Sequence, residues 1–134
     1  MVEIQLEQQY NYVGTTKEHM KSMHRLEEIY MEISKSDWKL FRARIAEWQE
    51  DYMERLVKEY IEVLNGTGNA SDKFWELEER IKKDKKHPGV MLELSKGNMI
   101  LDIVALINSG VITAADLEGF SDELRESVDF LLHR

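Results

Sequence analysis

The sequence predicts an all-α protein, an antiparallel bundle of four to six helices. Three observations favour this class. Only one proline occurs in 134 residues, and the seven glycines lie mostly between segments of regular apolar spacing. Within those segments apolar residues recur every three or four positions, which is the period of an amphipathic helix. Strand signals are scarce, and the alternation of apolar and polar residues over positions 2–7 stands alone.

The N-terminal part predicts an arm followed by a helix. Residues 1–14 are expected to form a flexible or strand-like arm, and residues 15–134 a single helical domain. Thr15 and Glu18 have the spacing of a capping box, so a first helix should begin there. Polar residues at 34–37 are expected to end this helix and to cap the next one.

One long helix is expected over residues 37–64, ended by the glycine-containing loop at 65–69. Its N-terminal half carries a narrow aromatic stripe, which predicts contact with a single neighbour, either the first helix or another subunit. Its C-terminal half carries a wider apolar arc, which predicts that this half is embedded in the core. The stripe consists of Trp38, Phe41, Ile45, Trp48 and Tyr52, and the arc of Met53, Leu56, Val57, Tyr60, Ile61, Val63 and Leu64.

A third helix should begin at Ser71, and Pro88 suits the first position of a fourth. Residues 90–107 are apolar nearly all round, which predicts a buried central helix. Gly97 leaves open whether this segment is one helix or two. The expected inner side of the third helix consists of Phe74, Leu77, Glu78 and Ile81.

The C-terminal part predicts two short capped helices. Thr113 and Asp116 should cap one that runs through Leu117, and Ser121 should cap the last one. The expected inner face of the last helix consists of Leu124, Val128, Leu131 and Leu132.

Reactive groups are few. The absence of cysteine excludes thiolate catalysis, disulfides and iron–sulfur clusters. No Glu-x-x-His pair, nucleophile elbow or phosphate-binding glycine loop occurs. The sequence therefore predicts no catalytic residue, no cofactor and no metal site, and it favours a protein that is not an enzyme. The four histidines lack the spacing of a ligand pair, and they are His19, His24, His87 and His133.

Asp102 is the ionisable residue with the most unusual setting, because it lies inside the most apolar segment. If it is buried, desolvation should raise its pKa, as in many functional carboxylates. A polar residue on a central helix more often reaches the rim of the bundle. Asp102 is therefore a candidate buried polar site, and it supports the alternative function, a small-ligand-binding protein or an enzyme with a pocket among the helices.

A basic island interrupts an otherwise acidic chain of net charge −8. It favours a third function, nucleic-acid binding, although no aromatic residue is interleaved for base stacking. The basic island also has a structural explanation, because basic side chains interact favourably with the C-terminal end of a helix dipole. The island consists of Arg80, Lys82, Lys83, Lys85 and Lys86.

The aromatic stripe is the strongest functional lead. Such stripes are often core, but Trp, Tyr and Phe also dominate interaction surfaces. Trp38, Phe41, Trp48 and Tyr52 are therefore the interface candidates, and the main prediction is a non-catalytic helical interaction or regulatory module that forms a homodimer. No secretory signal opens the chain, and the longest apolar stretch is too short to cross a bilayer. We expect a cytoplasmic protein with no membrane contact.

Overall fold

The computed structural model describes residues 16–134 and, within them, the side chains of residues 20–21 and 35–134. The predicted arm at 1–14 lies outside the described residues. The chain divides into two compact units, residues 1–35 and 36–134. In the first unit, residues 16–35 are α-helical. The second unit contains the remaining elements.

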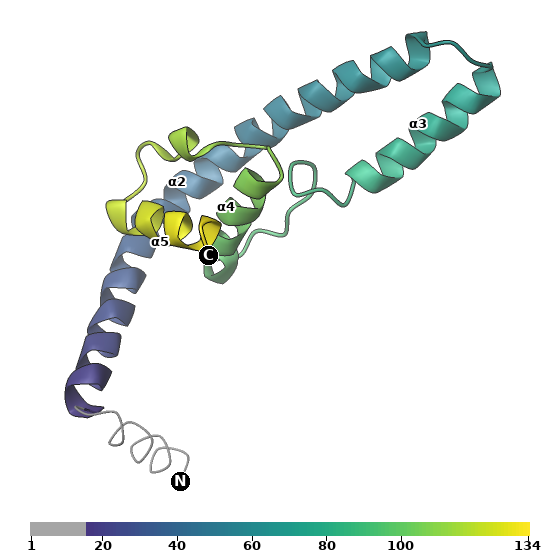
Figure 1. Ribbon diagram of the computed structural model, residues 1–134. Helices are drawn as coiled ribbons and strands as arrows, with labels where there is room; N and C mark the ends of the chain where they lie inside the picture. Colours follow the sequence, from purple (N-terminus) through teal and green to yellow (C-terminus); the bar gives the residue numbers. More distant parts are fainter. Residues whose placement is uncertain (1–15) are drawn as a thin grey trace. The chain divides into compact units, whose positions relative to one another are not determined.

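The predicted all-α class is confirmed, and no strand occurs between residues 16 and 134 (Figure 1). Four α-helices and two short 3-10 helices make up this part of the chain. None of these helices is both long and apolar enough to span a membrane. The elements are α2 (Thr16–Asn65), α3 (Ala70–Asp84), η1 (Lys96–Asn98), α4 (Met99–Asn108), η2 (Ala114–Leu117) and α5 (Asp122–Leu132).

One core lies in the second unit, where α4, α5 and the segments between them pack on the middle of α2. Burying this much apolar surface is the main source of stability in a domain of this size. Two arginines of α2 fasten the covering loops: Arg44 donates to the carbonyls of Asp116 and Glu118, and Arg55 donates to that of Gly110 at 2.9 Å. The buried residues are Phe41, Ile45, Trp48, Met99, Ile100, Ile103, Leu106, Val111, Ile112, Leu117, Phe120, Leu124 and Val128.

The predicted break at residues 34–37 is wrong, because α2 continues through them. Asp37 does not cap a helix. Its side chain is 3% exposed, and its carboxylate accepts hydrogen bonds from the Ser121 amide at 2.9 Å and the Ser121 hydroxyl at 2.7 Å. Because the carboxylate bonds to a residue 84 positions away, it does not compete for the backbone amides of its own helix, and the helix continues.

The predictions for the two halves of the long helix are reversed in the structure. Phe41 and Trp48 of the N-terminal half are buried, whereas most of the wide apolar arc is exposed. The reason is that α4 and α5 cover the earlier half, while α3 is the helix that lies beside most of the later half (Figure 1). The exposed arc residues are Met53, Val57, Ile61 and Leu64.

The predicted central helix is shorter than 90–107. Helix α4 begins only at Met99, and Gly97 lies in η1. Pro88 lies in a turn, where its carbonyl accepts a hydrogen bond from the Gln49 amide at 3.1 Å. Gly89 packs so closely on Tyr52 that a Cβ atom would lie 2.4 Å from the ring. This close contact with α2 holds the chain in a turn where the sequence predicts the start of a helix.

The C-terminal predictions are confirmed. The Thr113 amide donates to the Asp116 carboxylate at 2.7 Å at the start of η2. The Ser121 hydroxyl accepts from the Leu124 amide at 3.1 Å and caps α5. The Asp37 carboxylate holds this cap in place, because it accepts a hydrogen bond from the Ser121 hydroxyl.

Candidate interaction surface

Residues 53–86 form a helical hairpin, here called the hairpin arm, in which α3 returns beside the C-terminal end of α2 (Figure 1). No residue of α3 is buried. A helix of 15 residues is only marginally stable alone in water, so its contacts matter. The contacts that hold it against α2 are in part polar.

A polar cluster joins the two helices of the hairpin arm. The Tyr60 hydroxyl donates to the Asp84 carboxylate at 2.5 Å, and Arg80 forms a salt bridge with Glu59 at 2.9 Å. The Arg80 guanidinium also lies 5.6 Å from the centre of the Tyr60 ring. Burial, followed by the hydrogen bond to Asp84, raises the pKa of Tyr60 to about 12. These contacts fix the two helices as antiparallel neighbours.

A second cluster joins the hairpin arm to the core. The rings of Tyr52 and His87 stack with centroids 4.5 Å apart and planes at 8°. The Gly89 amide donates to Nδ1 of His87 at 3.0 Å. The Arg55 guanidinium lies over the Tyr52 ring, 5.0 Å from its centroid. Burial raises the pKa of Tyr52. The chain that leaves α3 is thereby fixed on the side of α2.

Beyond these clusters the hairpin arm exposes large apolar side chains. Phe74 and Trp75 are 63% and 62% exposed and meet edge to face at 5.0 Å. The predicted inner side of the third helix is therefore wrong for Phe74, Glu78 and Ile81, which are all exposed, and only Leu77 is partly buried. Single exposed apolar residues are ordinary, but a contiguous group marks an interaction surface. The group also contains Met53, Val57, Ile61, Leu64 and Ile81.

The exposed apolar residues of the two helices, with the exception of Trp75, share one side of the hairpin arm. At 100° per residue, the exposed residues of α2 lie about a quarter turn from the edge that carries Glu59 and Tyr60. Phe74 and Ile81 lie about a quarter turn, in the same sense, from the edge of α3 that carries Arg80. Because the two helices are antiparallel, equal rotations place both sets on the same side. The hairpin arm thus presents a two-helix apolar face.

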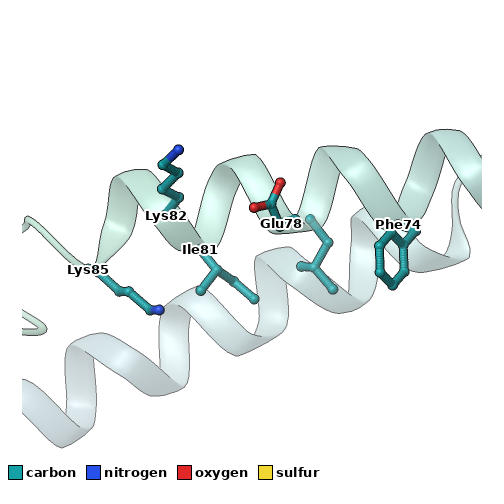
Figure 2. A pocket seen from close by; sticks show the side chains of 6 residues that line it. Phe74, Glu78, Ile81, Lys82 and Lys85 are labelled. Carbon is teal, nitrogen blue, oxygen red and sulfur yellow. The ribbon is translucent and has the colours of Figure 1, made fainter.

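A groove of roughly 460 Å³ runs along α3 at this face. In Figure 2, Phe74 and Ile81 extend from α3 in one direction, and Lys82 extends in the other. The groove combines apolar side chains with charged ones, as protein-binding surfaces do. Its lining consists of Phe74, Leu77, Glu78, Ile81, Lys82 and Lys85.

The interface candidates of the sequence belong largely to the core. Phe41 is fully buried and Trp48 is 8% exposed, while Trp38 and Tyr52 are partly buried against the same cluster. Phe41 lies 6.0 Å from Trp38 and 6.2 Å from Trp48 between ring centroids. The chain's own residues therefore cover Phe41 and Trp48 and partly cover Trp38 and Tyr52.

Sequence reasoning missed the hairpin arm as a surface. A signal was present at Phe74 and Trp75, because adjacent helical residues point about 100° apart. Two adjacent aromatic side chains therefore cannot both lie against one neighbouring helix. Combined with the exposed arc of α2, this pair indicates a surface.

Asp102 has one carboxylate oxygen that is buried without a hydrogen-bond partner, and burial raises its pKa. Asp102 lines neither the groove along α3 nor a more polar groove of roughly 310 Å³ beside Arg44. Within the part of the chain that the structure describes, no three His, Cys, Asp or Glu side chains gather to hold a metal ion.

The basic island lies at the C-terminal end of α3. Arg80 is paired with Glu59, and Lys82 and Lys85 line the groove. Nucleic-acid binding by this island remains a prediction. Comparisons with protein-family models, curated proteins and solved structures find no match. Function must therefore be inferred from the residues and their geometry.

Proposed function

We propose that this protein is a non-catalytic helical interaction module that binds a protein partner through the hairpin arm and self-associates. The observation that carries the proposal is the exposed pair Phe74 and Trp75 on a helix with no buried residue. Leaving such surface in water forfeits about 25 cal/mol for each Å² of apolar area. A partner that covers it would recover this free energy and would stabilise α3.

The place of the proposed interface differs from the one that the sequence predicts. Phe41 and Trp48 contribute to the fold, so a partner would have to contact Trp38 or Tyr52 at their partly exposed edges. The hairpin arm instead offers Phe74 at an open groove and Trp75 beside it, and aromatic residues are prominent among those that dominate binding energy. A cytoplasmic location remains part of the proposal, supported by a chain without cysteine.

The enzyme or small-ligand alternative is less well supported. It requires the Asp102 carboxylate to line a pocket, and the two grooves described above lie elsewhere. In the polar groove, the Arg44 guanidinium is already bound to the carbonyls of Asp116 and Glu118. Arg44 therefore stabilises the fold, and its guanidinium is not free to bind a substrate.

Site-specific photo-cross-linking tests the proposed function. Phe74, which lines the groove, is replaced by the photoreactive residue p-benzoylphenylalanine, and the full chain is irradiated both purified and in lysate of its source cells. Phe130 on α5, which is 70% exposed, is the matched control position. We expect a discrete protein adduct at position 74 and none at position 130. No adduct at position 74, or the same adducts at both positions, would contradict the proposal.

A further inference from the structure

Charge is distributed unevenly along the hairpin arm. The salt bridge between Arg80 and Glu59 divides the arm into a tip, residues 60–79, and a base, residues 53–58 with 81–86. The tip carries five acidic residues and one basic residue, a net charge of −4. The base carries six basic and two acidic residues, a net charge of +4. The arm is thus a charge dipole with equal and opposite ends.

From this symmetry we infer that the partner of the hairpin arm is the arm of a second copy of this chain, bound antiparallel, with the tip of each on the base of the other. This inference rests on the proposed function, because it names the occupant of the same surface. A two-fold axis through the middle of the arm places each −4 tip against a +4 base. Parallel pairing would place like charges together, at an energetic cost.

The apolar face supports the same arrangement. Two hairpins that meet through two-helix faces form a four-helix bundle, in which each apolar face is covered by the other. Phe74 and Ile81 lie on either side of the middle of α3, so a two-fold axis there brings Phe74 of each copy towards Ile81 of the other.

The charge of the whole chain does not oppose this pairing strongly. The chain carries a net charge of −8, so two copies repel each other at long range. At physiological ionic strength this repulsion is screened beyond about 8 Å. Contacts between tip and base act within that distance, so they determine the orientation.

Charge reversal at the two ends tests the pairing. A tip variant carries Glu76→Lys, Glu78→Lys and Glu79→Lys, and a base variant carries Lys82→Glu, Lys85→Glu and Lys86→Glu. All six side chains are exposed. In the tip variant both ends become positive, and in the base variant both become negative. Each variant alone should repel itself, whereas their mixture restores opposite charges at both contacts.

Sedimentation of the full chain reads out these states. We expect a wild-type dimer whose Kd rises with salt, an increase in Kd of about tenfold or more for each variant alone, and a heterodimer in the mixture. A control with Lys39→Glu and Lys96→Glu makes the chain more negative outside the arm and should stay dimeric. Circular dichroism checks that α3 persists, and the salt series needs no substitution. A wild-type monomer at high micromolar concentration, or variants that dimerise alone, would overturn the inference.

Cross-linking determines the orientation. The chain has no cysteine, so Ser71→Cys marks the tip and Lys86→Cys marks the base without background. In an antiparallel pair the two tips are separated by about 22 Å, the length of α3. A short bismaleimide should therefore link the mixture of the two variants and should leave Ser71→Cys alone unlinked. Equal linking of Ser71→Cys alone would contradict the antiparallel arrangement.

The two proposals fail differently. If the purified chain is monomeric while the photoreactive residue at position 74 captures a different protein, self-association is wrong and binding of a protein partner through the hairpin arm stands. If position 74 captures nothing under either condition, both are wrong.

Discussion

The two halves of α2 after Asp37 have similar apolar content and opposite surroundings. Phe41, Ile45 and Trp48 are buried beneath α4 and α5. One to three turns later, Met53, Val57 and Ile61 are between 41% and 51% exposed. The difference teaches that the breadth of an apolar arc on a helix does not determine its burial. What covers the helix does, and in this chain the covering residues come from about 50 or more positions further along.

A pair of phenylalanines tests this comparison with the largest expected effect. Phe41→Ala removes a fully buried ring and should lower the free energy of unfolding by about 3–5 kcal/mol. Phe74→Ala removes a ring that is 63% exposed and should cost less than about 1 kcal/mol in dilute solution. Urea denaturation of both variants at low protein concentration measures the difference. Equal losses would contradict the division into core and arm.

The contact between Asp37 and Ser121 should rank next. Asp37→Ala leaves the amide and hydroxyl of Ser121 without their carboxylate acceptor, so we expect a loss of about 2–3 kcal/mol. Asp37→Asn retains an acceptor and should lose less. Denaturation curves provide the measurement. A larger loss in Asp37→Asn than in Asp37→Ala would show that this carboxylate does not act as an acceptor.

The junction of arm and core provides a matched glycine pair. In Gly89→Ala the new Cβ would lie 2.4 Å from the Tyr52 ring, which forces a shift that should cost about 1–3 kcal/mol. In Gly97→Ala the nearest atom is 3.9 Å away, so the free energy of unfolding should change by less than about 0.5 kcal/mol. Thermal melts of the two variants compare them. Similar melting temperatures would refute the close contact at Tyr52.

The smallest effect concerns Tyr60 within the arm. Its pKa is raised from 10.0 to about 12, so the fold favours the neutral phenol that donates to Asp84. The stability that this contact contributes is fully present below pH 10 and is lost as the pH rises through 12. Tyr60→Phe should cost about 0.5–1.5 kcal/mol near neutral pH. The difference from wild type should shrink above pH 10, and a constant difference would argue against this contact.

These effects also show which features the sequence predicts. The caps at Thr113 and Ser121 are predicted correctly, because a cap joins a side chain to backbone three residues away. Asp37 is mispredicted, because an aspartate that caps a helix and one that accepts from Ser121 have the same local sequence. The close contact of Gly89 with Tyr52 likewise depends on residues 37 positions apart.

The candidate surface was less predictable than the fold. The aromatic stripe is compatible with either a core or an interface, and periodicity alone does not distinguish the two. Burial of Phe41 and Trp48 requires α4 and α5 to pack on that half of α2. The charge dipole of the hairpin arm was also hidden, because its acidic and basic residues cancel when α3 is taken as a single segment.

Hydrogen exchange measured over a dilution series tests the central claim most directly. Helix α4 contributes four buried residues to the core, whereas α3 has no buried residue. We predict that in dilute protein the α3 amides exchange much faster than the α4 amides, and that the α3 amides, unlike those of α4, gain protection as the concentration rises. Protection of α3 that matches α4 at the lowest concentration, and does not change with dilution, would contradict the account.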